Sequence, residues 1–158
     1  MDELARRVGE RLKAAHAILA TAESCTGGWA AQVVTSVAGS SAWFDRGFVT
    51  YSDAAKRELL GVRAETLESH GAVSEQTARE MARGALERSQ ATVALSITGV
   101  AGPGGGSRDK PVGTVCFAWA RGRELKSETR RLSGDRESVR RQSVVLALEG
   151  VLEALEGG

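Results

Sequence analysis

The chain has 158 residues, of which 42% are hydrophobic, 26% are charged and 4% are aromatic. This length fits one domain with a substantial core, and a net charge of +1 argues against a protein that binds nucleic acid through bulk positive charge. Two cysteines and two histidines are too few for a disulfide framework or a histidine-rich metal site.

The N-terminal part of the chain predicts helices that alternate with strands. Leucine and valine recur every four residues over residues 2–15, which predicts an amphipathic helix. The apolar run at residues 17–22 predicts a buried strand, and helical spacing resumes at Trp29 until Gly39 breaks it. Residues 46–51 predict a second strand, because they are rich in aromatic and β-branched residues.

The middle of the chain predicts two further helices. Ser52 or Asp53 can cap a short helix that Gly61 stops. After a connecting segment around His70, Ser74 caps a longer helix whose apolar residues fall on one face.

Three strands and a helix are predicted in the remainder. Residues 92–98 have the apolar density of a central strand, and residues 99–111 form a glycine-rich break long enough for a mobile functional loop. Residues 112–120 and 125–132 predict a hairpin. Asp135 caps a final helix with one apolar stripe.

This order of elements predicts the fold class α/β, with a three-layer α/β/α sandwich around a mixed β-sheet. No linker, repeat or low-complexity segment divides the sequence, so we expect residues 1–158 to form a single domain. The first ten residues lack the pattern of a signal peptide, and no apolar run reaches about 20 residues. We therefore expect a cytoplasmic protein without a membrane span.

Ligands of open α/β sheets bind at the carboxyl ends of strands, which directs attention to residues 23–28. Here a strand turns into a helix across Ser24, where free backbone N–H groups can stabilise an oxyanion. Gly27 and Gly28 let a substrate approach that backbone closely. The same residues also fit plain capping of the helix by Ser24 or Thr26.

A serine nucleophile needs a base, and with both histidines in ordinary contexts a neutral lysine is the better candidate. Lys56 falls near the first turn of a predicted helix, where the helix dipole disfavours an ammonium. Burial beside Trp43, Phe44, Phe48 and Tyr51, in a pocket lined by rings, would lower its pKa further. The alternative is a solvated lysine beside ordinary core aromatics.

Positive charge collects late in the chain, between Arg121 and Arg141. Arg136 follows Asp135, and Arg140 precedes Arg141, around a predicted helix start that is suited to hold one phosphate group. A solvated face of the hairpin and helix explains the same charge equally well.

Several long motifs, of which TAESCTGG at residues 21–28 is the most specific, resemble the signature of the CinA C-terminal domain family, also called nicotinamide-nucleotide amidohydrolase. The others lie at residues 39–41, 47–52, 70–74, 98–105, 110–115 and 134–136. The resemblance covers essentially the whole chain and is to the stand-alone form. It implies hydrolysis of nicotinamide mononucleotide to nicotinate mononucleotide and ammonia in pyridine-nucleotide recycling, by a Ser/Lys hydrolase without metal or other cofactor.

Position by position, the resemblance implies that Ser24 is the nucleophile and Lys56 the base. It further implies that Tyr51 supports catalysis, and it adds Ser41, Thr98 and Arg140 to the site, the last as a phosphate contact. For the oxyanion we expect backbone N–H groups near Thr26 and Gly27, beside Gly28, and for the ribose and phosphate the loop that begins at Gly99.

The resemblance implies a small-molecule substrate and an assembly of identical copies. The net charge and the lack of a long apolar run predict no nucleic-acid or membrane partner. Two alternatives stay open at this point. Cys25 could be the attacking residue in place of Ser24. The chain could also be a non-catalytic nucleotide-sensing or interaction module related to the competence/damage-inducible protein CinA.

Overall fold

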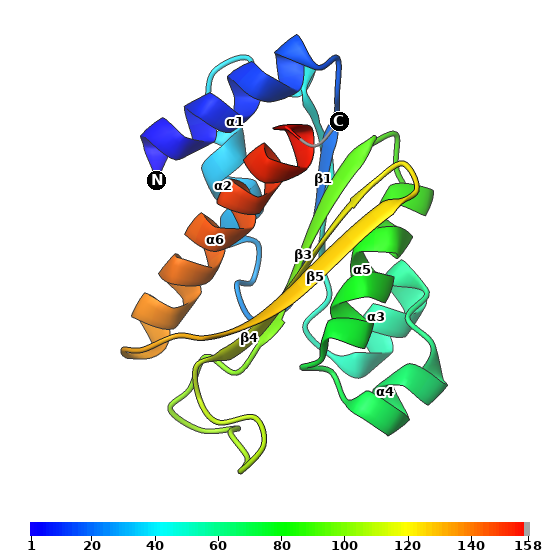
Figure 1. Ribbon diagram of the computed structural model, residues 1–158, viewed down its shortest axis with the longest axis vertical. Helices are drawn as coiled ribbons and strands as arrows, with labels where there is room; N and C mark the ends of the chain where they lie inside the picture. The colour runs from blue at the N-terminus through cyan, green and yellow to red at the C-terminus, as the bar shows by residue number, and fades with distance from the viewer. Residues whose placement is uncertain (157–158) are drawn as a thin grey trace.

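A mixed sheet of five strands runs through the computed structural model, which describes residues 1–156 (Figure 1). The strands are β1 (Leu19–Glu23), β2 (Phe44–Val49), β3 (Val93–Gly99), β4 (Thr114–Arg121) and β5 (Glu124–Arg131). Their order is β2-β1-β3-β4-β5, with β1 parallel to both neighbours, and with β4 antiparallel to β3 and to β5. The last two residues of the predicted domain 1–158 lie outside the described residues.

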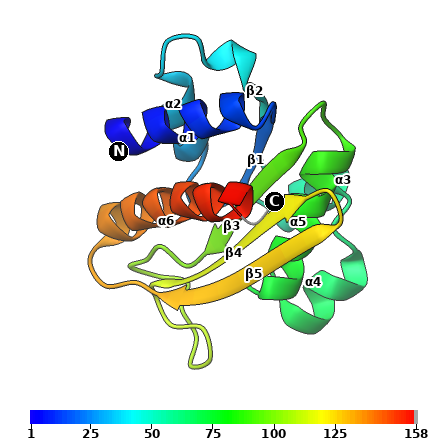
Figure 2. The same ribbon diagram turned by 45° about the horizontal axis from the view of Figure 1, so that its top comes forward.

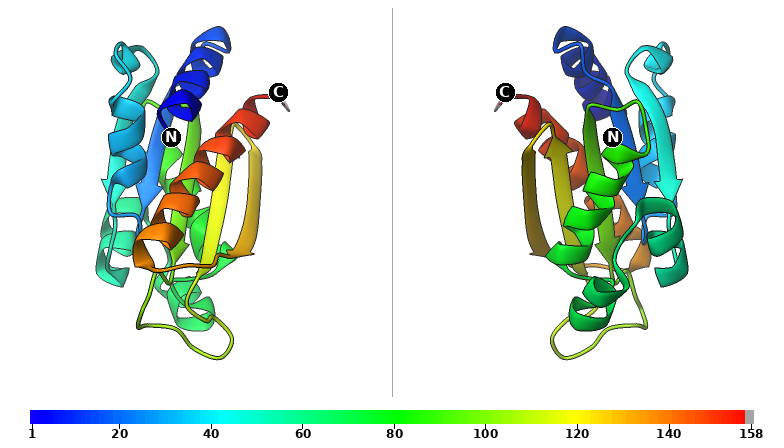
Figure 3. Two further views of the ribbon diagram at one scale, coloured as in Figure 1. Left: turned by 90° about the vertical axis from the view of Figure 1, so that its left-hand side faces the viewer. Right: turned by 90° about the vertical axis from the view of Figure 1, so that its right-hand side faces the viewer.

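Within residues 1–156, six α-helices form a layer on each face of the sheet. They are α1 (Asp2–Ala14), α2 (Trp29–Thr35), α3 (Asp53–Leu60), α4 (Ala64–His70), α5 (Glu75–Glu87) and α6 (Arg136–Glu156). The helices α1, α2 and α6 cover one face, and α3, α4 and α5 cover the other (Figure 3). The predicted α/β/α sandwich with a mixed sheet is therefore confirmed. No helix in the described part of the chain is long and apolar enough to span a membrane.

The larger core lies between the sheet and the layer of α1, α2 and α6, where α6 runs along the sheet beside α1 (Figure 2). Strand β1 is buried over its whole length, which fits its apolar residues Leu19, Ala20 and Ala22 and leaves Thr21 and Glu23 as buried polar groups. The predicted stripe of α6 is buried against the sheet and comprises Val144, Leu148, Val151 and Leu155. Trp119 of β4 packs on α6 at Gly150, where a Cβ would lie 2.1 Å from the indole ring.

On the opposite face, α3 packs closely against α5. A Cβ on Gly84 of α5 would lie 1.9 Å from the backbone oxygen of Leu60, the last residue of α3. The glycine therefore lets the two helices approach backbone to backbone, and α3 is the helix that carries Lys56. Ser52 and Ser74 cap α3 and α5 as predicted, each accepting a hydrogen bond from a backbone N–H in the first turn.

Strand β2 starts and ends earlier than the strand predicted over residues 46–51. Its first residue, Phe44, pairs with Leu19 at the beginning of β1. The strand ends at Val49, which pairs with Glu23 at the end of β1, although the Thr50 N–H still donates to the Glu23 oxygen at 2.8 Å. Pairing with β1 therefore sets the boundaries of β2, whereas the positions of the β-branched residues in β2 do not.

Helix α4 occupies the segment that the sequence predicts only as a connection. Its N-cap residue, Arg63, makes no capping side-chain hydrogen bond. Instead Glu80 of α5 accepts hydrogen bonds from the Arg63 backbone N–H and from the Thr66 hydroxyl. A tertiary contact thus stabilises this short helix, which explains why no local signal predicts it.

Candidate active site

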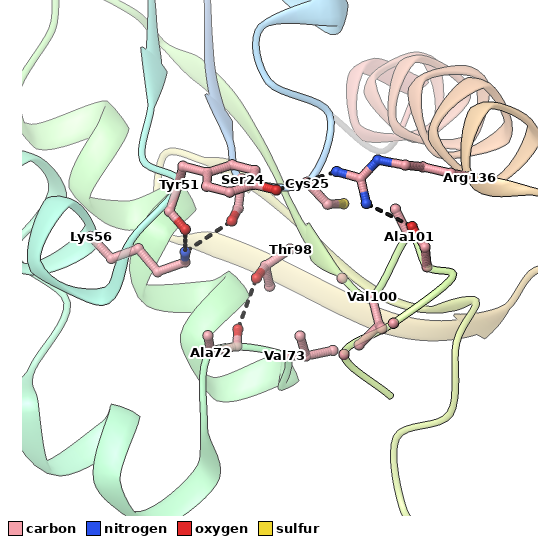
Figure 4. Close-up of a pocket in the computed structure, with 14 residues that line it drawn as sticks. Ser24, Cys25, Tyr51, Lys56, Ala72, Val73, Thr98, Val100, Ala101 and Arg136 are labelled. Carbon is pink, nitrogen blue, oxygen red and sulfur yellow. Dashed lines mark hydrogen bonds between the residues drawn. The ribbon is translucent and has the colours of Figure 1, made fainter. Parts of the chain in front are cut away.

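Ser24 and Lys56 meet at the carboxyl end of β1, the sheet edge at which the sequence predicts a site (Figure 4). Ser24 directly follows β1 and is 7% exposed, and Lys56 is the fourth residue of α3 and is 1% exposed. The Lys56 Nζ atom lies 2.9 Å from Ser24 Oγ. The predicted nucleophile and base are therefore in hydrogen-bonding contact, and the alternative of a solvated lysine is wrong.

Two backbone carbonyls hold the end of the Lys56 side chain. Nζ donates to the oxygen of Thr50 at 2.9 Å and to that of Tyr51 at 3.4 Å. Carbonyl oxygens can only accept, so a neutral amine directs its two N–H bonds at them. Its lone pair is then left to face the Ser24 hydroxyl, which is the orientation that a general base needs.

Burial lowers the pKa of Lys56 below its usual range, because desolvation disfavours the ammonium, while the charge of Asp53 acts in the opposite direction. Within residues 1–156, no carboxylate forms an ion pair with Lys56. The amine is thus more often neutral at physiological pH than that of a surface lysine. Burial also raises the pKa of the Cys25 thiol to about 12, which keeps it protonated and a poor nucleophile.

A buried carboxylate, Glu23, organises the turn after β1 and was not predicted. It accepts hydrogen bonds from the Thr26 hydroxyl at 2.6 Å and from the backbone N–H groups of Ala30 and Ala31 at 2.8 and 3.0 Å. The carboxylate thus replaces an N-cap side chain for α2, whose N-cap residue is Gly28. The signal that could have revealed it is an acidic residue at the end of an apolar strand.

Capping of a helix by Ser24 or Thr26 is wrong. Helix α2 begins at Trp29 and receives no side-chain cap from its N-cap residue. Thr26 donates its hydroxyl hydrogen to Glu23 and does not accept one from the helix. The side chain of Ser24 therefore does not cap a helix; it lines the pocket and contacts the Lys56 amine.

The backbone N–H groups of this turn differ in what they can still bind. Gly27 donates its N–H to the Ser24 carbonyl at 3.0 Å, so this expected oxyanion donor is already engaged. Among the described residues, the N–H groups of Cys25 and Thr26 have no acceptor. Cys25 lines the pocket, whereas Thr26, Gly27 and Gly28 do not. The N–H next to Ser24 is therefore the donor best placed for an oxyanion.

Ser24 and Lys56 open into a pocket of about 260 Å³. The turn after β1, the start of α3, the segment before α5 and the glycine-rich loop after β3 form its walls (Figure 4). Thr98 and Gly99, both predicted, line it. Thr98 donates its hydroxyl hydrogen to the oxygen of Ala72 at 2.9 Å, so only its lone pairs remain for a ligand.

Arg136 lines this pocket, whereas Arg140, the predicted phosphate contact, does not. Arg136 is the first residue of α6 and donates to the oxygen of Gly102 at 2.7 Å and to the Tyr51 hydroxyl at 3.3 Å. Arg140 lies one turn further along and donates to the two backbone carbonyls after Ser24 at 3.0 and 3.2 Å. Its guanidinium thus stabilises the turn that presents the nucleophile.

Ser41 and three of the four predicted aromatic residues lie away from the pocket. Ser41 is exposed in the 3-10 helix η1 (Ser40–Ala42), which leads into the amino end of β2. Trp43 packs against α1, and Phe44 and Phe48 pack against two separate core clusters. Tyr51 alone of the four lines the pocket, so the expected ring-lined pocket is wrong.

Within residues 1–156, no three histidine, cysteine or acidic side chains lie close enough together to hold a metal ion. The pocket instead presents a hydroxyl beside an amine, a free backbone N–H and, at Arg136, a guanidinium. These groups suit acyl transfer from an amide or ester, with the hydroxyl as nucleophile and the amine as base.

Comparison with known proteins places the chain in a family. Residues 1–155 match the family model described as the CinA C-terminal domain. The chain belongs to this family. The nicotinamide-nucleotide amidohydrolase PncC of Escherichia coli K12 is 58% identical to this CinA C-terminal domain over 149 residues, which cover 93% of the chain and 90% of that protein. The protein of the same name from Pseudomonas putida is 52% identical over 150 residues, with coverage of 95% and 94%.

Solved structures of CinA proteins share this fold. A competence/damage inducible protein, CihA, from Agrobacterium tumefaciens has a TM-score of 0.94 at 49% identity, covering 98% of this chain and 94% of that one. A CinA superfamily protein from Klebsiella pneumoniae has a TM-score of 0.96 at 44% identity, covering 99% and 98%. The mixed sheet and both helical layers are thus the family's architecture.

Proposed function

We propose that this CinA C-terminal domain is a nicotinamide-nucleotide amidohydrolase, which hydrolyses nicotinamide mononucleotide to nicotinate mononucleotide and ammonia. The observation that carries the proposal is the 2.9 Å contact between Lys56 Nζ and Ser24 Oγ in a buried pocket. The names of the relatives from Escherichia coli and Pseudomonas putida, both nicotinamide-nucleotide amidohydrolases, support the choice of substrate.

In the first step, neutral Lys56 accepts the hydroxyl proton of Ser24 while Oγ attacks the carboxamide carbon. The positively charged pyridinium ring withdraws electrons from that carbon and makes it more reactive than an ordinary amide carbon. The ammonium formed on Lys56 donates to the carbonyl oxygens of Thr50 and Tyr51, which already accept its N–H bonds.

The tetrahedral intermediate carries a negative oxygen, which the backbone N–H of Cys25 stabilises. One such donor typically lowers the barrier by about 3 to 4 kcal/mol. The lone pairs of Thr98 Oγ1 accept an N–H of the substrate's amide and orient it. Lys56 then returns its proton to the departing nitrogen, which leaves as ammonia. Water, deprotonated by Lys56, hydrolyses the acyl-serine, releases nicotinate mononucleotide and regenerates Ser24.

The resemblance also implies work in pyridine-nucleotide recycling and an assembly of identical copies, and the sequence itself favours the cytoplasm. We include all three in the proposal. Light scattering coupled to gel filtration measures the assembly. Deletion of the gene followed by measurement of cellular nicotinamide mononucleotide tests the pathway, with accumulation as the expected result.

The direct test measures ammonia release from nicotinamide mononucleotide by the wild type, Ser24→Ala and Lys56→Ala. We expect each variant to lose at least about 100-fold in rate with an unchanged circular dichroism spectrum. Ser36→Ala and Lys126→Ala are the matched controls, because both residues are exposed and lie outside the pocket. Equal rates for the wild type and Ser24→Ala would remove Ser24 as the nucleophile.

The competing function, a nucleotide-sensing or interaction module, predicts a different result of the same assay. Such a module would bind the nucleotide but release no ammonia, even at high protein concentration. The desolvated amine of Lys56, in hydrogen-bonding contact with the Ser24 hydroxyl, favours the enzyme, because such shifted pKa values are typical of catalytic sites.

A further inference from the structure

We infer that Arg136 forms an anion subsite at the mouth of the pocket and binds the phosphate group of the nucleotide. The inference rests on the proposed function, because the phosphate in question is that of the proposed substrate. It assigns to Arg136, and not to Arg140, the selection of a nucleotide over the corresponding nucleoside.

The residues that line the pocket become more exposed from its floor to its mouth. Ser24 and Lys56 are buried at the floor, whereas Tyr51 is 65% exposed and Arg136 is also exposed. A cavity of about 150 Å³ holds a benzene molecule, so the pocket of about 260 Å³ holds a pyridine ring with limited room beyond it. With the carboxamide at Ser24, the sugar and phosphate must extend toward the mouth.

Arg136 keeps both donors and charge for a ligand. A guanidinium has five N–H donors, and the oxygen of Gly102 and the Tyr51 hydroxyl take one each. Both acceptors are neutral, and within residues 1–156 no carboxylate forms an ion pair with Arg136. A planar guanidinium with unused N–H groups suits the oxygens of a phosphate.

The charges around the pocket favour an anion. Lys56 and Arg136 are the basic residues of its lining, which contains no aspartate or glutamate. When Lys56 is neutral, as attack on the amide requires, Arg136 supplies the positive charge. The N-terminus of α6 cannot supply this positive charge in place of Arg136. Asp135 already accepts the Ser138 N–H there at 2.9 Å, and its carboxylate is negatively charged.

Arg140 is a weaker candidate for the phosphate because its guanidinium is committed elsewhere. Two of its nitrogens donate to the carbonyl oxygens of Cys25 and Thr26, and the guanidinium lies 5.6 Å from the centre of the Trp29 ring. Moving it to a ligand would release the turn that presents Ser24. Substitution of Arg140 should therefore weaken the binding of the nucleotide and of the nucleoside equally.

The test compares binding of nicotinamide mononucleotide and nicotinamide riboside, measured by titration calorimetry on Ser24→Ala protein so that no turnover interferes. Adding Arg136→Gln should weaken binding of the mononucleotide about 10- to 100-fold, the effect of losing charge-assisted hydrogen bonds. Binding of the riboside should change by less than about twofold, because it lacks the phosphate. Arg123→Gln, at the exposed turn of the hairpin, removes the same charge away from the pocket and should change neither affinity.

Three results would overturn the inference. Equal weakening for both ligands would mean that Arg136 acts through the loop at Gly102 and not on the phosphate. An unchanged affinity for the mononucleotide in Arg136→Gln would remove its role, and so would failure of the Ser24→Ala protein to bind either ligand.

Failure of the proposed function would look different. If the wild type releases no ammonia while Arg136 still discriminates the two ligands, the anion subsite stands and the hydrolase does not. If the wild type releases ammonia and Arg136→Gln keeps the same kcat/KM for the mononucleotide, the hydrolase stands and the subsite does not.

Discussion

Lys56 and Ser24 are 32 residues apart in the sequence, yet a hydrogen bond of 2.9 Å joins their side chains. Their contact follows from the parallel pairing of β1 and β2. Ser24 leaves the end of β1, and β2 leads at the same edge into α3, which carries the lysine. Two neighbouring parallel strands thus bring the proposed nucleophile and base to one point, as expected for the carboxyl edge of an α/β sheet.

The pH dependence of catalysis should reflect the neutral form of Lys56. Since the deprotonated amine is the base, kcat/KM should rise with pH and level off above the pKa of Lys56. Burial lowers this pKa, so the plateau should begin below the value of about 10.4 for free lysine. Nicotinamide riboside is the control substrate, because its profile lacks the phosphate ionisation near about pH 6. A profile that stays flat into the acidic range would contradict a lysine base.

Asp53 should tune this ionisation. Its negative charge favours the ammonium and raises the pKa of Lys56 against the effect of burial. Asp53→Asn should therefore lower that pKa and move the acid limb of the rate profile to lower pH. Glu58→Gln removes an exposed carboxylate from the same helix and should leave the limb in place. A limb that moves to higher pH in Asp53→Asn would show that the sign is wrong.

Cys25 should be dispensable for the reaction. Its thiol, with a pKa raised to about 12 by burial, is protonated at neutral pH and reacts slowly with alkylating agents. Iodoacetamide at neutral pH should therefore leave ammonia release unchanged, and Cys25→Ala should keep most of the activity. Inactivation that parallels the alkylation of one cysteine per chain, identified by mass spectrometry as Cys25, would instead support a cysteine nucleophile.

Thr98 should discriminate between the amide substrate and the carboxylate product. Its hydroxyl hydrogen is held by Ala72, so the oxygen presents only lone pairs, which accept an amide N–H and repel a carboxylate. Thr98→Val should raise KM about fivefold, the effect of one hydrogen bond of about 1 kcal/mol. It should also strengthen inhibition by nicotinate mononucleotide.

Thr98→Ser is the matched control for that experiment, because it keeps the hydroxyl. It should behave like the wild type in both measurements. If Thr98→Val weakens substrate and product binding equally, Thr98 has a structural role in the pocket wall and does not distinguish the two groups.

Glu23 should stabilise the fold and the active-site turn together. Glu23→Gln would bring an amide NH₂ group against backbone N–H donors of α2, and we expect a loss of about 2 kcal/mol in the free energy of unfolding. Urea unfolding measures it, with Glu68→Gln on the exposed surface as a control expected to change stability by less than about 0.5 kcal/mol. Unchanged stability would contradict the capping role.

Local signals predicted most of the fold. Ser52, Ser74 and Asp135 cap helices as expected, because a capping side chain acts on residues directly after it. The buried strands appear as short apolar runs, and the stripe of α6 as a helical repeat. The contact of Ser24 with Lys56 could also be predicted from the sequence, because it requires only a strand end, a helix start and parallel pairing of the two strands.

Features set by long-range packing could not be predicted in this way. Arg136 and Arg140 are one helical turn apart on α6. Which of them reaches the pocket depends on how α6 packs on the sheet, and the contact of Trp119 with Gly150 helps to fix that packing. The aromatic residues near Lys56 are close in sequence but separate in space. Phe44 packs against one core cluster, whereas Phe48 of the same strand packs against another.

The close approach of Gly84 to Leu60 extends the catalytic requirements beyond the pocket. Leu60 ends the helix that carries Lys56, so the spacing between α3 and α5 helps to hold the amine in its buried position. Residue 84 carries no reactive group, yet we expect a methyl there to push α3 away from α5 and so to disturb the position of Lys56. The packing of two helices is thus a requirement for placing the amine, in addition to the side chains that surround it.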